Sequence, residues 1–146
     1  MSTERPRLVG INHVALEVGD LDAAVEFYGA IFELRGVDFE PGMAFIDMGD
    51  QFLALSRGRS QAADTNRHFG LVVDDRSEVM TLAVVAGATI PEGRPFNFLD
   101  PWGNRIEIVE YRDIQFTKTQ AILDALGVAG AKSQIAKEEL RKKNFL

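Results

Sequence analysis

Two histidines and one glutamate within a predicted strand are the residues of this sequence best suited to bind a metal ion. The chain has only two histidines, His13 and His68, and each begins a segment that alternates as a β-strand does. Glu107 lies in the alternating run 105–111, where a carboxylate needs a partner because an unpaired charge is costly to bury. Two imidazoles and a carboxylate suit Fe(II), Mn(II), Zn(II) or Ni(II) and leave coordination positions open for a substrate. We therefore expect a divalent metal on His13, His68 and Glu107.

Each of these residues, taken alone, can also be explained by a structural role without a metal. A single strand histidine is usually a hydrogen-bonded core or surface residue, and Glu107 could pair with Arg105 or Arg94. The three residues at related positions of a repeated unit favour the metal site. The position of the first unit that corresponds to Glu107 is predicted to be Leu53, which cannot ligate, so three protein ligands are expected rather than four.

The elements that must position these residues form an internal repeat. The segment His68–Val73 matches His13–Val18 at an offset of 55, with histidine, leucine and valine identical. An aspartate follows each segment and is predicted to cap a helix, Asp20 before 21–34 and Asp75 before 76–86. Strand patterns then recur around 37–39, 43–48 and 51–56 in the first unit, and around 88–90, 94–99 and 105–111 in the second.

The pattern predicts an α+β fold made of two paired β-α-β-β-β modules that form a cupped mixed sheet. The modules are expected at about 8–57 and 67–111, within one domain of residues 1–112, with a polar linker between them. Gly36 and Gly87 are predicted to end the two helices, and Glu78 to complete a capping box. Residues 113–146 are expected to form a C-terminal extension with helices at about 118–128 and 133–143.

The composition of the chain excludes several kinds of partner and of chemistry. The net charge of −6 argues against nucleic acid or an anionic membrane surface as the partner. The absence of cysteine excludes disulfides, thiolate metal ligands and cysteine nucleophiles. No segment has the pattern of a signal peptide or a membrane-spanning helix, so a cytoplasmic protein is expected.

The motifs together resemble the vicinal oxygen chelate superfamily, also called the glyoxalase/bleomycin-resistance/dioxygenase group. The resemblance rests on four stretches between about residues 8 and 111: Asn12-His13-Val14-Ala15-Leu16, the helix 20–28, His68 at the start of the second unit, and Asp100-Pro101-Trp102-Gly103-Asn104-Arg105-Ile106-Glu107. It implies that paired modules form a cup in which a metal on His13, His68 and Glu107 chelates a substrate through adjacent oxygens. It also implies that modules pair within one chain or between two, and we expect a homodimer.

The resemblance leaves the reaction open. Glyoxalase I-like and epimerase-like members use a fourth ligand where this chain has Leu53, so a dioxygenase-, lyase- or thiol-transferase-like reaction fits better. The alternative is a small-molecule or antibiotic-binding protein of the same fold that performs no reaction. The residues predicted to contact a substrate, from strand parity and from their nearness to the turn, are Arg105, Gln51, Phe45, Trp102 and Phe98.

Overall fold

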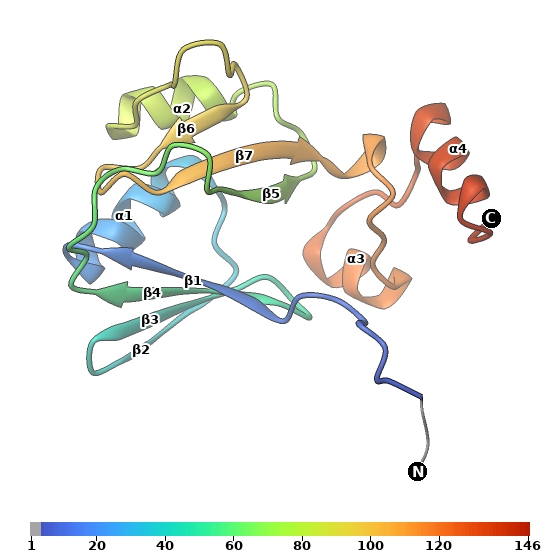
Figure 1. The fold of residues 1–146 in the computed structure, drawn as a ribbon, viewed down its shortest axis with the longest axis horizontal. Helices are drawn as coiled ribbons and strands as arrows, with labels where there is room; N and C mark the ends of the chain where they lie inside the picture. The colour runs from blue at the N-terminus through green and yellow to red at the C-terminus, as the bar shows by residue number, and fades with distance from the viewer. Residues whose placement is uncertain (1–3) are drawn as a thin grey trace.

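The computed structural model describes residues 4–146, so the first three residues of the predicted domain 1–112 lie outside the described residues. The fold is α+β, as predicted, with two sheets, their helices and a C-terminal extension that stands apart at one end (Figure 1). No helix within residues 4–146 combines the length and the apolar character needed to cross a bilayer.

The first module has the predicted β-α-β-β-β order. Its elements are β1 (His13–Val18), α1 (Leu21–Ile31), β2 (Val37–Glu40), β3 (Met43–Asp47) and β4 (Phe52–Arg57). The strands are ordered β1-β4-β3-β2, with β1 parallel to β4 and the other neighbours antiparallel. The Asp20 carboxylate accepts a hydrogen bond of 2.8 Å from the backbone N–H of Ala23, which confirms the predicted cap of α1.

The second module repeats this order with one strand fewer. Its elements are β5 (Phe69–Val73), α2 (Val79–Ala86), β6 (Asn97–Leu99) and β7 (Arg105–Glu110), and its strand order is β5-β7-β6. The strand predicted near 88–90 is wrong: only the isolated bridge between Thr89 and Leu99 forms there. The strand predicted over 94–99 begins at Asn97, because the backbone N–H of Asn97 instead closes a turn on the carbonyl of Arg94.

Both helix predictions need correction at one end. The first helix ends at Ile31 rather than near Leu34, because Phe32 already has extended backbone angles, φ −118° and ψ 148°. The second helix starts at Val79 rather than Arg76. Asp75 does not cap it, because its carboxylate accepts from the backbone N–H of Ser77 in a local turn, and Glu78 makes no side-chain cap. Gly87 ends that helix with φ 111°, as predicted.

One hydrophobic core joins the modules through their helices. Phe27 and Tyr28 of α1 are buried with Val79 and Ala83 of α2, and the two helices are in contact. The inner face of each strand contributes the other core side chains, such as Leu16 and Val18 of β1. This leaves the opposite faces of the strands, which carry His13 and Glu107, on the outer sides of the two sheets.

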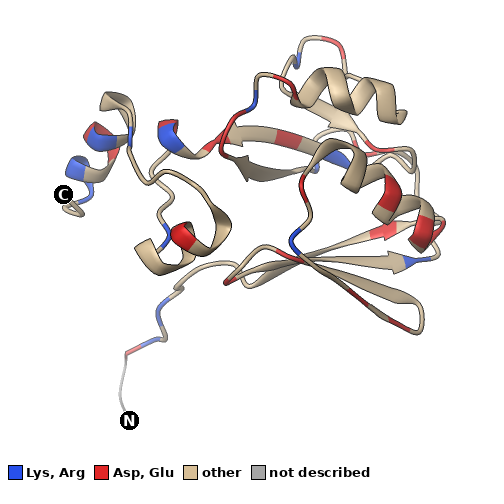
Figure 2. Cartoon of the chain, turned by 180° about the vertical axis from the view of Figure 1, so that it is seen from behind, with Lys and Arg blue, Asp and Glu red and all other residues tan. Residues whose placement is uncertain are grey.

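The C-terminal extension lies at one end of the two sheets (Figure 1). It contains η1 (Tyr111–Asp113), α3 (Gln120–Leu126) and α4 (Gln134–Lys142). Lys132 donates hydrogen bonds to the carbonyls of Tyr111 and Phe116, and its ammonium lies 3.3 Å from the Tyr111 ring centroid. Ile122 of α3 packs against the turn at Gly49. Charged residues of both signs lie on α4, whereas α2 carries none (Figure 2).

Candidate metal centre

His68 and Glu107, two of the three predicted ligands, meet on the second module. Nε2 of His68 lies 3.3 Å from Oε2 of Glu107, and the two side chains are 36% and 42% exposed. Glu107 is paired across the parallel β5–β7 ladder with Gly70, which has no side chain to compete for this space. The structure therefore presents an imidazole and a carboxylate together at a site that solvent reaches.

His13 lies in the first module and does not join His68 and Glu107. It begins β1, and its ring is stacked on Phe52 with the centroids 4.6 Å apart and the planes 10° apart. It lines a cavity of about 810 Å³ that is also lined by residues of β1, β5, both module helices and the C-terminal extension, but not by His68 or Glu107. Across residues 4–146, no three His, Asp or Glu side chains gather closely enough to hold a metal ion. One chain thus assembles two of the three predicted ligands.

Each histidine is held through its Nδ1 atom. Nδ1 of His13 lies 2.8 Å from Oδ1 of Asn12, and Nδ1 of His68 lies 2.8 Å from the backbone oxygen of Asn66. In both cases Nε2 is the ring nitrogen left for a ligand, and for His68 it is the nitrogen that faces Glu107.

The position in the first module that corresponds to Glu107 is Ala54, and the prediction of Leu53 is wrong by one residue. Ala54 is paired with Ala15, two residues after His13, just as Glu107 is paired with Gly70, two residues after His68. A shift of one residue along a strand reverses the face, and Leu53 accordingly belongs to the core. Alanine cannot ligate a metal, so the first module still supplies no fourth ligand.

Four of the five residues predicted to contact a substrate fall into two pairs. Gln51 lines the cavity, where its Nε2 donates to the carbonyl of Ile11 at 2.8 Å, and the Phe45 ring lies 5.8 Å from that of Phe52 beside His13. Phe98 is 0% exposed, and Trp102 packs on Phe27 in the core. Phe98 therefore packs inside the module, whereas Trp102 is partly buried against α1.

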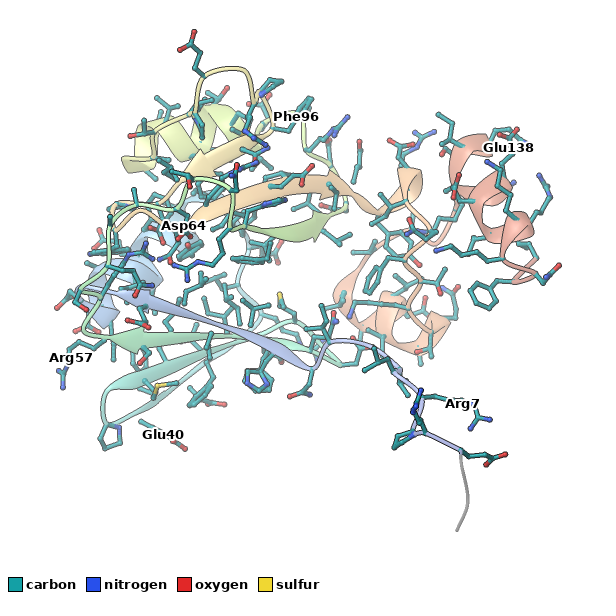
Figure 3. The ribbon with its side chains drawn as sticks, in the orientation of Figure 1. Arg7, Glu40, Arg57, Asp64, Phe96 and Glu138 are labelled. Atoms are coloured by element: carbon teal, nitrogen blue, oxygen red, sulfur yellow. The ribbon has the colours of Figure 1, made fainter. Side chains whose placement is uncertain are left out.

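Arg105, the fifth predicted substrate residue, is 2% exposed and has protein partners. Its Nε donates to Oδ1 of Asn97 at 2.7 Å, and its Nη1 donates to the carbonyl of Thr65. Its backbone N–H donates to Asp64, which lies in the linker between the two sheets (Figure 3). Arg105 therefore ties the linker to β7, two residues before Glu107.

Asp64 is the centre of this linker network, and no pattern in the linker sequence predicts this role. Its carboxylate accepts hydrogen bonds from Arg67 at 2.8 Å and from Arg59 at 3.4 Å. Burial raises its pKa, but the hydrogen bonds from Arg67, the Arg105 backbone and Arg59 outweigh burial, so the pKa of Asp64 lies below its ordinary value of 3.8. These hydrogen bonds hold the linker in place, and the linker leads directly to His68.

A second buried network fixes the turn before β7. Tyr28 Oη donates to the Asp100 carboxylate at 2.8 Å, and the backbone and side chain of Asn104 donate to the same carboxylate. Burial, and then the Asp100 charge, raise the pKa of Tyr28 well above 10. Gly103 has φ +91°, and a Cβ there would lie 2.7 Å from Cα of Ala63.

Comparison with known proteins agrees with this architecture. The chain is 29% identical to the uncharacterized protein PA2024 of Pseudomonas aeruginosa over 119 residues, which span 66% of this chain and 85% of the relative. A solved variant of the fosfomycin resistance protein FosX from Listeria monocytogenes, in complex with Mn(II) and 1S,2S-dihydroxypropylphosphonic acid, has a TM-score of 0.60 at 18% identity, covering 70% of this chain and 90% of that one. An integron cassette protein of V. cholerae has a TM-score of 0.55 at 24% identity, covering 73% and 98%.

These solved structures share the fold with this chain. The family model for the Glyoxalase/Bleomycin resistance protein/Dioxygenase superfamily matches residues 10–108, which include the first module, most of the second, both histidines and Glu107. The chain belongs to the Glyoxalase/Bleomycin resistance protein/Dioxygenase superfamily.

Proposed function

We propose that this protein is a metal-dependent enzyme that acts on a small molecule with two adjacent oxygen atoms. His68 and Glu107 of one copy and His13 of a second copy hold a divalent ion, so each site is shared within a homodimer. The observation that carries the proposal is the contact between Nε2 of His68 and the Glu107 carboxylate.

This contact places two electron-pair donors against each other. With Nδ1 of His68 directed at the carbonyl of Asn66, the Nε2 lone pair faces a carboxylate oxygen, and a cation between the two atoms would stabilise this arrangement. Two ligands at about 2.1 Å from one ion lie about 3.0 Å apart at a right angle and about 3.4 Å apart at the tetrahedral angle. The observed 3.3 Å falls within this range, so the pair fits a metal ion as well as a proton.

The division of the ligands supports a second copy as the source of His13. Strands β1 and β5 each end their sheet, so both have an edge without a hydrogen-bonded neighbour in the described chain. In the proposed twofold dimer, β1 of one copy lies beside β5 of the other, and symmetry repeats that contact. The same pairing carries His13 toward the partner's second module.

The ligand set determines what the ion contributes. One carboxylate and two imidazoles suit Fe(II), Mn(II), Zn(II) or Ni(II), which when bound supply Lewis acidity to adjacent substrate oxygens. The residues of this chain have the other roles: Phe52 stacks on His13 and is itself in contact with Phe45, which gives the site an apolar side, and Gln51 offers an amide to a polar group of the substrate. The reaction is dioxygenase-, lyase- or thiol-transferase-like.

Metal binding by chelator-treated protein tests the proposal. We expect Mn(II) titrated by calorimetry to bind with one ion per chain, and Glu107→Gln or His68→Ala to weaken binding by at least about 100-fold. The matched control is Glu110→Gln, a carboxylate of the same strand that pairs with Arg76 instead. Failure of the unaltered protein to bind Mn(II), Fe(II), Zn(II) and Ni(II) would overturn the proposal and favour a metal-free small-molecule binding protein.

A further inference from the structure

The two histidines are oriented by acceptors of different kinds. The Asn12 side chain holds His13, whereas the main chain of Asn66 holds His68, both at 2.8 Å from Nδ1. An amide oxygen and a peptide oxygen only accept hydrogen bonds, so Nδ1 must be the donor in each case. The proton is thereby placed on Nδ1, and the Nε2 lone pair of each ring is directed away from its anchor.

We propose that Asn12 is a positioning residue that fixes the tautomer and ring orientation of His13 for coordination through Nε2. This inference rests on the proposed function, because coordination is the task that the orientation serves. An acceptor on the second nitrogen of a ligating histidine fixes its tautomer and increases its basicity. Asn12 has this relation to His13 through one side-chain bond, and no acceptor other than Asn12 contacts that ring in the described chain.

The surroundings of Asn12 fix where its side chain can reach. Its carbonyl accepts a hydrogen bond of 3.2 Å from the backbone N–H of Phe52, which anchors the main chain of Asn12 to the start of β4. The Phe52 ring lies flat against the His13 ring and fixes its plane. The stacking and the hydrogen bond together hold the imidazole in the observed orientation.

Asn66 offers an internal control for this inference. Its contact with His68 uses the backbone carbonyl, so replacing its side chain leaves the acceptor in place. The linker that carries this carbonyl is braced independently, through Arg105 to Thr65 and through Asp64 to Arg67. Asn12→Ala and Asn66→Ala therefore make the same chemical change beside the two histidines but remove an acceptor from only one of them.

The first test needs no metal. In ¹⁵N-labelled, metal-free protein at alkaline pH, where imidazoles are neutral, we expect the proton of His13 on Nδ1. Asn12→Ala should move it to Nε2 or distribute it over both nitrogens, Asn12→Asp should restore it because a carboxylate oxygen is again the acceptor, and Asn66→Ala should leave His13 unchanged. A proton on Nε2 of His13 in the unaltered protein would overturn the proposal, since the Asn12 amide would then be donating.

The second test measures Mn(II) affinity by calorimetry. Loss of such an acceptor lowers metal affinity about 10- to 100-fold, so we expect that loss in Asn12→Ala, recovery in Asn12→Asp and a change below about twofold in Asn66→Ala. Equal losses in both alanine variants would show a structural effect and overturn the inference. If neither the unaltered protein nor any variant binds metal, the proposed function fails. The tautomer measurement still decides the role of Asn12 in that case.

Discussion

A metal site shared between two copies can be rebuilt from two inactive variants. In His13→Ala the first module cannot complete a site, and in Glu107→Ala the second module cannot. On the proposed shared site, we expect each variant alone to form a dimer in which both sites lack one ligand. In a mixed dimer, however, the intact His13 of the second variant should meet the intact His68 and Glu107 of the first.

The expected recovery follows from the symmetry of the dimer. Random pairing of equal amounts makes about half of the dimers mixed, and each mixed dimer has one complete site out of two. The mixture should therefore bind Mn(II) at about one quarter of the stoichiometry of the unaltered protein, with unaltered affinity at those sites. The His13 ring stacks on a half-buried Phe52, and Glu107 is 42% exposed, so both variants should keep the fold.

The assay is Mn(II) calorimetry on the separate variants and on the mixture, with subunit exchange confirmed by native mass spectrometry of differently tagged chains. Mixed dimers that bind no metal would refute the shared site. Tight stoichiometric binding by either variant alone would show that the residue replaced in it is not a ligand. A mixture of His13→Ala with Glu110→Gln is the control, and it should give about half of the unaltered stoichiometry, because every chain then carries His68 and Glu107 but only half of the chains carry His13.

Three further predictions concern the networks that position the second module. Tyr28→Phe removes a donor to the buried Asp100 carboxylate and should lower the free energy of unfolding by about 1.5–3 kcal/mol in urea titrations; an unchanged midpoint would contradict this role. Gly103→Ala places a side chain at a positive φ and brings its Cβ within 2.7 Å of Cα of Ala63, so it should lower the free energy of unfolding by more than about 1–3 kcal/mol in the same assay. The depressed pKa of Asp64 stabilises the fold above pH 3.8, and this stability is lost as pH falls through the lower folded pKa, so Asp64→Asn should flatten the fall in unfolding free energy below pH 3.8; parallel pH curves would count against it.

Local signals were sufficient to predict most of the first module. Asp20 caps α1 because its side chain reaches the N–H of Ala23, three residues away, and a cap of this kind is visible in sequence. The same reasoning failed for Asp75, whose carboxylate found a closer donor at Ser77. Both aspartates have the same sequence signal, and only the competing local hydrogen bond separates their outcomes.

The site was predictable where strand parity decided it, and not where distant segments met. Parity placed Glu107 beside the strand that follows His68, and the structure brings these two side chains into contact. Arg105 has the same parity, yet it donates hydrogen bonds to Asp64 and to the carbonyl of Thr65 in the linker. Strand periodicity cannot predict a contact of this kind. Asn12 directly precedes His13 in sequence, but the hydrogen bond between their side chains depends on side-chain rotamers that the sequence pattern does not determine.

If the ion joins two copies, metal binding and dimerisation are linked, and each must strengthen the other. A separated chain retains at most two ligands, so the metal favours the dimer by RT ln(1 + [L]/Kd) at each site, about 2.7 kcal/mol when the free metal is 100 times its Kd. Two sites then lower the dimer dissociation constant by about 10⁴-fold, which dilution of metal-free and Mn(II)-loaded protein in analytical ultracentrifugation should reveal. An ion held within one chain would raise the melting temperature and leave the dissociation constant unchanged, so a shift in the dissociation constant is the result that a site within one chain cannot produce.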